Sequence, residues 1–233
     1  MKIIDIIILS FAKSDKHYNL TVNCIKSLKE SKLNTAFNII VVETNPSVNY
    51  DEFNVKTLHF DEPFNYNGFA NKAIMSCDNE LIGVFNNDVI FDDNWFTEIM
   101  KLDVGNTIDS LSPISLTSAS QREFVGCKYP VAGYEIARHV SGWALVFTRE
   151  LWLKIGGLSE IVNFWCSDDV YAKQLQEHGI NHYLIPTSIV NHVENGSNTL
   201  KTLEADYKES LTYGQARIWN KEFNDNKFGL NGK

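Results

Sequence analysis

Short apolar runs alternate with amphipathic stretches along the first hundred residues of the chain. Four runs have the length and apolar content of strands buried in a sheet, and they cover residues 3–10, 38–42, 55–60 and 81–85. The stretches between and after them repeat apolar residues at helical spacing, and they predict helices that end near residues 31, 76 and 101. Strands that alternate with helices in this way predict a mostly parallel sheet with helical crossovers.

The pattern is less regular after residue 101. Residues 103–137 show no sustained period, and we expect a long functional or mobile loop there, or a surface insertion without a catalytic role. Regular elements then resume, with strands expected at 141–147 and 182–190 and helical segments at 149–155, 170–178 and 202–219.

The composition is that of an ordinary globular protein, since 44% of the 233 residues are hydrophobic and 21% are charged. The formal net charge of -8 argues against a surface built for broad polyanion binding. One window is less acidic than its surroundings, because it contains Arg122, Arg138 and Arg149.

Two further features indicate the compartment. The four cysteines are widely scattered without a C-x-x-C pair, which favours a reducing environment over a disulfide framework or a zinc ribbon. The apolar run at 3–11 contains Asp5 and is too short to span a membrane. We therefore expect a cytoplasmic protein without stable membrane association.

Polar side chains follow two of the predicted strands. Glu43 comes directly after strand 38–42, and Asn86, Asn87 and Asp88 follow strand 81–85. In open α/β sheets, ligands bind at the carboxyl ends of strands, and carboxylate and amide oxygens suit Mg²⁺ or Mn²⁺ shared with phosphates. The alternative is an Asn-rich turn that only ends the strand. Neither the dinucleotide-binding motif G-x-G-x-x-G nor the P-loop motif G-x-x-x-x-G-K-[ST] is present, so any bound phosphate must be held by other residues.

Later clusters extend this ordered set, namely Asn67 to Ala73 (NGFANKA), Gly142, Gly156 with Gly157, Asp168 with Asp169, and His192. From residue 3 to about residue 200, the clusters together resemble the GT-A fold glycosyltransferases, in particular those similar to glycosyltransferase family 2. Asn86, Asn87 and Asp88 stand where that family has its DXD-type metal motif, often relaxed to N-x-D.

The resemblance implies a single α/β domain of the Rossmann-like GT-A kind, with a mostly parallel central sheet flanked by helices and a small acceptor-side subregion. It divides the chain into a nucleotide-sugar-binding half (1–101), an acceptor-side half (102–200) and a C-terminal helical tail (201–233). The implied activity is that of a metal-dependent inverting glycosyltransferase, a hexosyl- or pentosyltransferase. Such an enzyme transfers a sugar from a nucleoside diphosphate sugar to a hydroxyl acceptor.

The resemblance also assigns roles to individual residues. A divalent cation, Mn²⁺ or Mg²⁺, would bind at Asp88 and His192. The nucleotide sugar would contact residues at or near the strand ends, namely Ser10, Glu43, Asn67, Lys72, Asn86 and Asn87. The platform for the sugar or the acceptor would comprise Trp143, Trp165 and Arg149.

The acidic pair departs from the family pattern, which usually has Glu-Asp. Ser167-Asp168-Asp169 permits two alignments; the better one puts Asp168 at the catalytic position and leaves Asp169 as the alternative. A carboxylate there is ionised at neutral pH and can remove the proton of the acceptor hydroxyl. The structural alternative is a helix N-cap, a position that Asp favours, and Asp169 can cap while Asp168 catalyses. Glu43 also departs, since Asp is more usual there.

Other functions stay open on the same fold. A non-catalytic module that binds a sugar nucleotide or a glycan is one, and a sugar-1-phosphate nucleotidyltransferase is another, although no Gly-rich basic loop follows the first strand. Glycan hydroxyls are the default acceptor of the family. A hydroxymethylated base of phage DNA is the alternative, motivated by the small size and the arginines at 122–149, and it implies the host cytoplasm.

Overall fold

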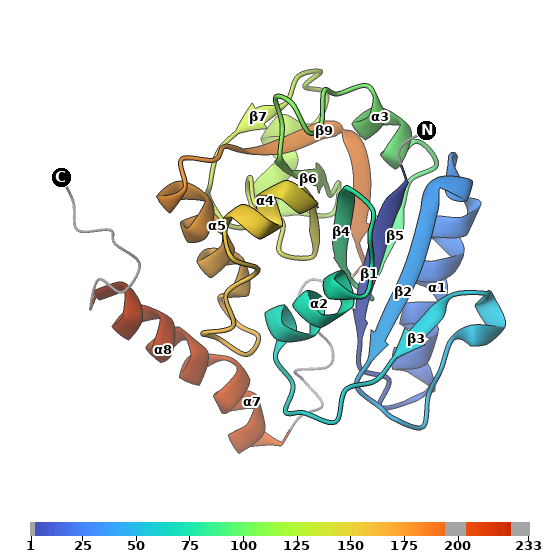
Figure 1. Ribbon diagram of the computed structural model, residues 1–233, viewed down its shortest axis with the longest axis vertical. Helices are drawn as coiled ribbons and strands as arrows, with labels where there is room; N and C mark the ends of the chain where they lie inside the picture. Colours follow the sequence, from blue (N-terminus) through green and yellow to red (C-terminus); the bar gives the residue numbers. More distant parts are fainter. Residues whose placement is uncertain (1–2, 194–203, 225–233) are drawn as a thin grey trace.

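The computed structural model describes residues 3–193 and 204–224, and a sheet of nine strands forms the centre of this part of the chain (Figure 1). The strand order is β3-β2-β1-β4-β8-β6-β9-β5, with β7 paired beside β9. Because the order is not sequential, helical connections cross from strand to strand, as the alternating pattern predicts.

The first half of the sheet is built around β1 (Ile4–Ser10), whose seven residues are all buried. β1 pairs in parallel with β2 (Phe37–Glu43) on one side and with β4 (Leu81–Asn86) on the other. The short β3 (Lys56–Leu58) extends the parallel set beyond β2. The carboxyl ends of β1, β2 and β4 therefore lie at one edge of the sheet.

The second half joins the first through β8 (Ala144–Thr148), which runs antiparallel to β4. β8 also pairs antiparallel with β6 (Ser110–Ile114), and β6 pairs in parallel with the long β9 (His182–His192). β9 in turn holds the two short antiparallel strands, β5 (Val89–Phe91) and β7 (Val131–Ala132). The predicted α/β fold with a central, mostly parallel sheet is confirmed.

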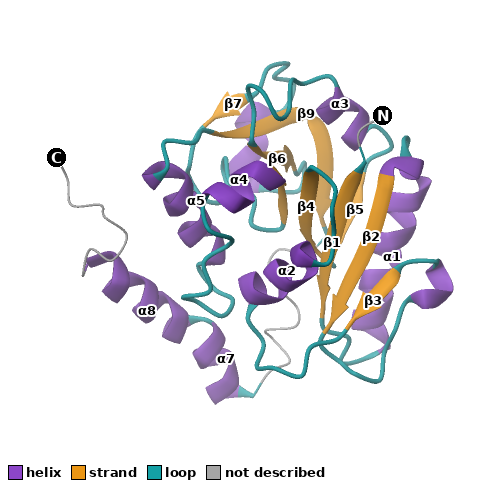
Figure 2. Cartoon of the chain, viewed as in Figure 1, coloured by secondary structure: helices purple, strands orange, loops and turns teal. Residues whose placement is uncertain are grey.

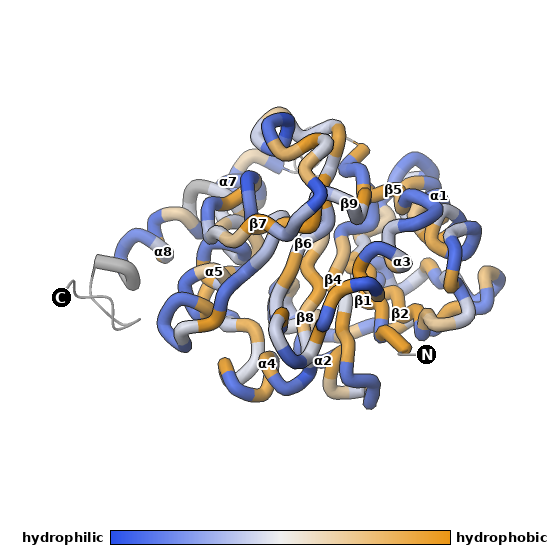
Figure 3. Tube along the Cα trace, turned by 90° about the horizontal axis from the view of Figure 1, so that it is seen from above, coloured by the Kyte–Doolittle hydropathy of each residue, from blue (hydrophilic) through white to orange (hydrophobic). Residues whose placement is uncertain are grey.

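Helices cover both faces of this sheet (Figure 2). Alternate β1 residues point to opposite faces, so Ile6 packs in a core with residues of α1 (Asp15–Glu30) and α3 (Trp95–Met100). Ile7 packs in the other core, which includes residues of α2 (Tyr66–Met75), α4 (Arg149–Lys154) and α5 (Ser167–Glu177). The strands accordingly form an apolar interior (Figure 3).

The remaining elements are short or lie at the periphery. Three 3-10 helices occur in the connections, at η1 (Asn34–Ala36), η2 (Asp51–Phe53) and η3 (Ala119–Phe124). Two C-terminal helices, α7 (Ala205–Leu211) and α8 (Tyr213–Asn224), lie on the side of the molecule opposite α1 (Figure 1). The tail helix expected at 202–219 is thus two helices, and its residues 202–203 fall outside the described part.

The prediction of an irregular 103–137 segment is wrong in one respect, because β6 is a buried central strand. Its serines are polar but satisfied: Ser110 Oγ lies 2.7 Å from Tyr171 Oη and 2.8 Å from His182 Nδ1. Ser112 Oγ accepts a hydrogen bond from the backbone N–H of Ser141 at 3.0 Å. A strand with hydrogen-bonded serines and a proline lacks the apolar run by which the other strands are recognised.

One further boundary differs from expectation. The helix expected from residue 170 begins at Ser167, so Asp168 and Asp169 lie in its first turn and Cys166 takes the N-cap position. Among the described helices, none combines the length and apolar content that crossing a bilayer requires.

Candidate active site

Three strand ends meet at one edge of the sheet. Asn86 is the last residue of β4, and its backbone N–H donates to the carbonyl of Trp143, just before β8, at 3.0 Å. β9 ends at His192, which pairs in register with Val89 of β5. The backbone N–H of Val193 donates to the Asp88 carbonyl at 2.9 Å. These contacts bring the predicted metal motif next to the predicted histidine.

Asp88 and His192 form a pair through their side chains. His192 Nε2 lies 3.1 Å from Asp88 Oδ1, and both side chains are largely buried. The Trp143 ring stacks on the imidazole at a centroid distance of 5.2 Å, and Ser115 Oγ accepts from the His192 backbone N–H at 3.1 Å. Trp143 therefore packs on one face of the imidazole, Ser115 fixes the His192 backbone, and one ring nitrogen is directed at the carboxylate.

The pair offers one oxygen and one nitrogen donor, a combination that suits Mn²⁺. The two donors come from strands that the sheet fixes in register, so an ion there would find its protein ligands already close together. Within residues 3–193 and 204–224, no group of three or more His, Cys, Asp or Glu side chains is arranged to hold a metal ion. The donors present fit an ion that also uses ligands from a substrate.

Asp168 lines the same cavity as His192. It stands in the first turn of α5, directly over Gly142, where an added Cβ would come within 2.6 Å of Asp168 Oδ2. The preceding Cys166 adopts a left-handed conformation with φ of 68°, which turns the chain into the helix. Burial, followed by the charge of Asp169, raises the pKa of Asp168 to about 6. Asp168 is thus held close to Gly142, and its carboxylate binds a proton more readily than that of an exposed aspartate.

A cavity of about 270 Å³ joins the two places. Asp168, Asp169 and Gly142 line it, together with Asn86 and His192. The rest of the lining consists of Cys166, Ser167 and a largely apolar wall of Tyr66, Ile136, Trp143, Phe164 and Trp165. The structure therefore brings together the acidic pair, the end of β4, the histidine and two of the three predicted platform residues.

Comparison with known proteins rests on structure. No protein-family model matches the sequence, and no curated protein matches it either. Many solved structures are similar, among them the mannosyltransferase PcManGT from Pyrobaculum calidifontis in complex with GDP-Man and Mn²⁺. That match has a TM-score of 0.61 at 12% identity and covers 85% of this chain. The chain has the GT-A glycosyltransferase fold. It spans 59% of the length of that mannosyltransferase.

Tyr66 is a cavity residue of this GT-A fold that the sequence pattern did not reveal. Its hydroxyl donates to Asn86 Oδ1 at 3.0 Å and lies 3.4 Å from the Gly142 carbonyl. Burial raises its pKa, and the nearby charges of Asp168 and Asp88 add to the effect. Tyr66 therefore links Asn86 to the backbone of Gly142, beside Asp168, and orients the Asn86 side chain. It stands directly before the cluster from Asn67 to Ala73, and no motif marks it.

The predicted nucleotide contacts at the ends of β1 and β2 are engaged within the protein. Glu43 is fully buried, and its carboxylate accepts from the backbone of Ala12 and Asn45 and from the Tyr50 hydroxyl. Ser10 Oγ lies 2.7 Å from Thr21 Oγ1. These contacts tie together the loops after β1 and β2 of the GT-A fold. The nucleoside-binding role of Glu43 and Ser10 stays a prediction.

Three other predicted nucleotide contacts lie outside the cavity lining. Asn87 turns back toward α1 and donates to Thr21 Oγ1 at 2.9 Å. Asn67 is buried and donates to the Ser159 carbonyl at 2.7 Å. Lys72 forms an ion pair with Glu62 and lies over the Phe60 ring. Each side chain has a structural partner that the sequence alone did not indicate.

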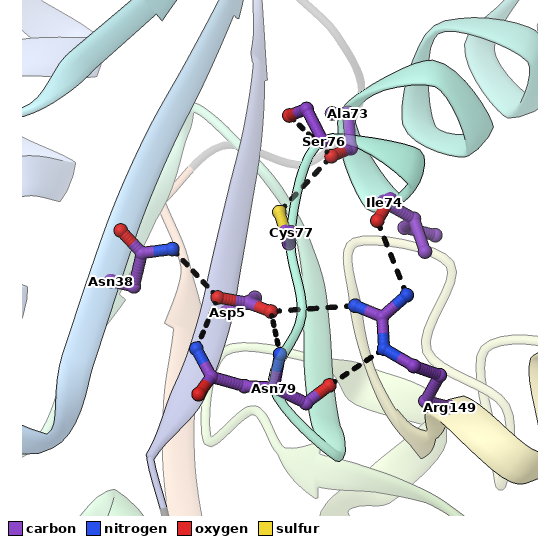
Figure 4. Close-up of polar contacts among 8 residues, drawn as sticks. All are labelled: Asp5, Asn38, Ala73, Ile74, Ser76, Cys77, Asn79 and Arg149. Carbon is purple, nitrogen blue, oxygen red and sulfur yellow. Dashed lines mark hydrogen bonds and ion pairs between the residues drawn. The ribbon is translucent and has the colours of Figure 1, made fainter.

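The structure does not bring Arg149 to the cavity. Because β8 runs antiparallel to β4, Arg149 follows β8 at the end of the sheet opposite Asn86. There its guanidinium lies 3.5 Å from the fully buried Asp5 carboxylate and donates to the carbonyls of Asn79 and Ile74 (Figure 4). Asp5 also accepts from Asn38 (Figure 4). The geometry indicates a structural role for Arg149.

Arg149→Gln is expected to lower the free energy of unfolding by about 2–3 kcal/mol, because Asp5 loses the charge that faces it in the interior. Chemical denaturation measures this loss. The matched control is Arg122→Gln at an exposed site, with an expected change within about 0.5 kcal/mol. Unchanged stability of Arg149→Gln together with weakened binding of the sugar or the acceptor would instead return Arg149 to the predicted platform.

Gly142→Ala is expected to displace the Asp168 carboxylate, because the added carbon would come within 2.6 Å of it, and a reaction that uses this carboxylate should slow about 100-fold. A double-mutant cycle with Asp168→Asn checks the cause. If the glycine acts through that carboxylate, the double variant has the same activity as Asp168→Asn alone. Additive losses would mean that Gly142 acts through another contact.

Proposed function

We propose that the chain is a metal-dependent, inverting glycosyltransferase that transfers a sugar from a nucleoside diphosphate sugar to an acceptor hydroxyl. The observation that supports this most is that one cavity is lined both by Asp168 and by His192, whose imidazole pairs with Asp88. The reaction needs a base near the acceptor hydroxyl and charge compensation near the diphosphate. The GT-A fold, shared with a mannosyltransferase solved with GDP-Man and Mn²⁺, supports the same reaction class.

Asp88 and His192 would hold the cation. A bound Mn²⁺ or Mg²⁺ supplies positive charge that stabilises the departing diphosphate. Because the protein would supply only two ligands, the others would have to come from diphosphate oxygens and water, as is usual for cations shared with phosphate substrates. We therefore infer that the cation and the nucleotide bind together rather than separately.

Asp168 would act as the general base. Its carboxylate accepts the proton of the acceptor hydroxyl while the acceptor oxygen forms a bond to the anomeric carbon. The bond from that carbon to the diphosphate oxygen breaks, and its electron pair leaves with the diphosphate. Attack from the face opposite the leaving group inverts the anomeric configuration. A pKa of about 6 leaves Asp168 ionised at neutral pH and gives it more proton affinity than an exposed aspartate.

Ser10, Glu43 and Asn86 remain the candidates for nucleoside contact, since β1, β2 and β4 end at the same edge of the sheet. Binding through Glu43 would require its carboxylate to exchange the hydrogen bond from Tyr50 for one from the ligand. We expect the enzyme to act in the cytoplasm, which the scattered cysteines of the sequence favour.

The pH dependence of turnover tests the base. At saturating donor, kcat is expected to rise with pH through an apparent pKa near 6, because Asp168 works only after it loses its proton. Asp168→Asn should lower kcat by about 10²–10⁴-fold. Asp61→Asn, at an exposed site, serves as the control and keeps the profile. An unaltered profile in Asp168→Asn would transfer the role to Asp169.

Thermal unfolding with Mn²⁺ and nucleoside diphosphates tests the cation site. Together the two ligands, about 100-fold above their Kd, should raise the Tm by about 5–10 °C, and either one alone by much less. Asp88→Asn is expected to remove the metal-dependent part of the shift. Asp93→Asn changes an exposed carboxylate that pairs with Lys32, and it should keep the full shift. A full shift in Asp88→Asn would contradict the ligand assignment.

A further inference from the structure

The segment between β6 and β8 contains a fully buried glutamine. Gln121 lies in η3, and its side chain is shielded from solvent. It does not belong to the residues that line the cavity. A buried amide has to complete its hydrogen bonds within the protein, so the partners of Gln121 show which parts of the chain it connects.

Both ends of the Gln121 amide are bonded to other segments. Gln121 Oε1 accepts a hydrogen bond from the backbone N–H of Ser115 at 2.7 Å. Gln121 Nε2 donates to Ser141 Oγ at 2.8 Å, and it lies 3.4 Å from the Arg138 carbonyl. Ser115 and Ser141 are themselves fully buried. One side chain therefore connects the residues that follow β6 to the residues that precede β8.

The residues that follow β6 fix the end of β9. Ser115 Oγ accepts from the His192 backbone N–H at 3.1 Å, and Thr117 Oγ1 donates to the His192 carbonyl at 2.7 Å. Both backbone groups of His192 are thus bonded to the segment that Gln121 holds through Ser115. The place of the imidazole beside Asp88 therefore depends on this segment.

The residues that precede β8 lead to the close approach at Asp168. Gly142 follows Ser141, and an added Cβ there would come within 2.6 Å of Asp168 Oδ2. The Ser141 carbonyl accepts from the backbone N–H of Ala144 at 2.8 Å, which forms the turn into β8. Because the Ser141 hydroxyl accepts from Gln121, a displacement of that glutamine would move the backbone beside the proposed base.

We infer that Gln121 is a positioning residue, which sets the place of His192 at the cation site relative to the backbone beside Asp168. It acts from behind the cavity, through Ser115 on one side and Ser141 on the other. Removal of a group that orients a metal ligand in this way typically costs about 10–100-fold in affinity or activity. The inference rests on the proposed function, because it names a residue that prepares that site.

Three variants separate the two sides of this connection. Ser115→Ala removes the acceptor of the His192 N–H, so it should raise the Kd for Mn²⁺ about 10-fold at a fixed nucleoside diphosphate concentration and lower kcat only about 2-fold. Ser141→Ala removes the acceptor of Gln121 Nε2, so it should lower kcat about 10-fold and raise that Kd only about 2-fold. Gln121→Leu should show both large effects.

Ser188→Ala is the matched control. Ser188 is also fully buried, but its hydroxyl donates to the Trp95 carbonyl at 2.8 Å, and neither residue lines the cavity. The control should lower the Tm as the other variants do and leave Kd and kcat unchanged. Losses in Gln121→Leu that do not exceed those of Ser188→Ala would overturn the inference. If Gln121→Leu does not fold, parental Kd and kcat in both Ser115→Ala and Ser141→Ala would overturn it instead.

Hydrogen exchange in the ligand-free protein distinguishes this inference from the proposed function. Gln121→Leu should speed the exchange of the Ser115 and His192 amides at least about 10-fold, whereas Ser188→Ala should not. Faster exchange in a protein that neither binds Mn²⁺ nor transfers any sugar would contradict the proposed function and leave the connection through Gln121 standing. Transfer by the parent protein, with unaltered exchange, Kd and kcat in Gln121→Leu, would do the reverse.

Discussion

The pairing of β4 with β8 is the contact on which the site depends. Phe85 lies opposite Ala144 in this antiparallel register, and the backbone hydrogen bond from Asn86 to Trp143 continues it by one step. This register places Gly142, the point of closest approach to Asp168, next to the end of the parallel half of the sheet. A slip by one residue would turn the polar end of β4 to the other face, so the apolar interiors of both strands also fix the site.

The sequence predicts the parallel half well because its strands are continuous apolar runs between amphipathic helices. The sequence does not predict β6, because this buried strand contains serines whose hydroxyl groups are hydrogen-bonded, in place of a continuous apolar run. Ser110 and Ser112 lie in the interior because Tyr171, His182 and the Ser141 backbone complete their hydrogen bonds. Such partners come from distant positions in the chain, and no local pattern reveals them. Burial lowers the pKa of His182 to about 3, so this network contains a neutral imidazole at physiological pH.

In the candidate site, too, the features with a local sequence pattern could be predicted, and those that depend on distant parts of the chain could not. The order of the motifs correctly groups Asp168, Asn86 and His192 around one cavity, because strand ends and helix starts can be located from the sequence. The direction of a strand cannot be read in this way, and Arg149 therefore falls at the far end of an antiparallel strand. The carboxylate of Glu43 presents a different problem: its charge is evident from the sequence, but its three protein partners are not.

Two asparagines, Asn65 at the N-cap of α2 and Asn71 within it, explain how the apolar wall of the cavity is held. Asn65 donates to the carbonyls of Glu160 and Val162, and Asn71 bonds both backbone groups of Leu158. From the other side, Gln215 accepts from the backbone N–H of Asn163 at 2.5 Å. The segment that leads to Trp165 and Asp168 is thus fastened to α2 and to the C-terminal helices before any ligand arrives. Because this segment is already ordered, ligand binding does not have to overcome the entropy cost of ordering it. The Trp165 indole and the Asp168 carboxylate are therefore in place before the ligand binds.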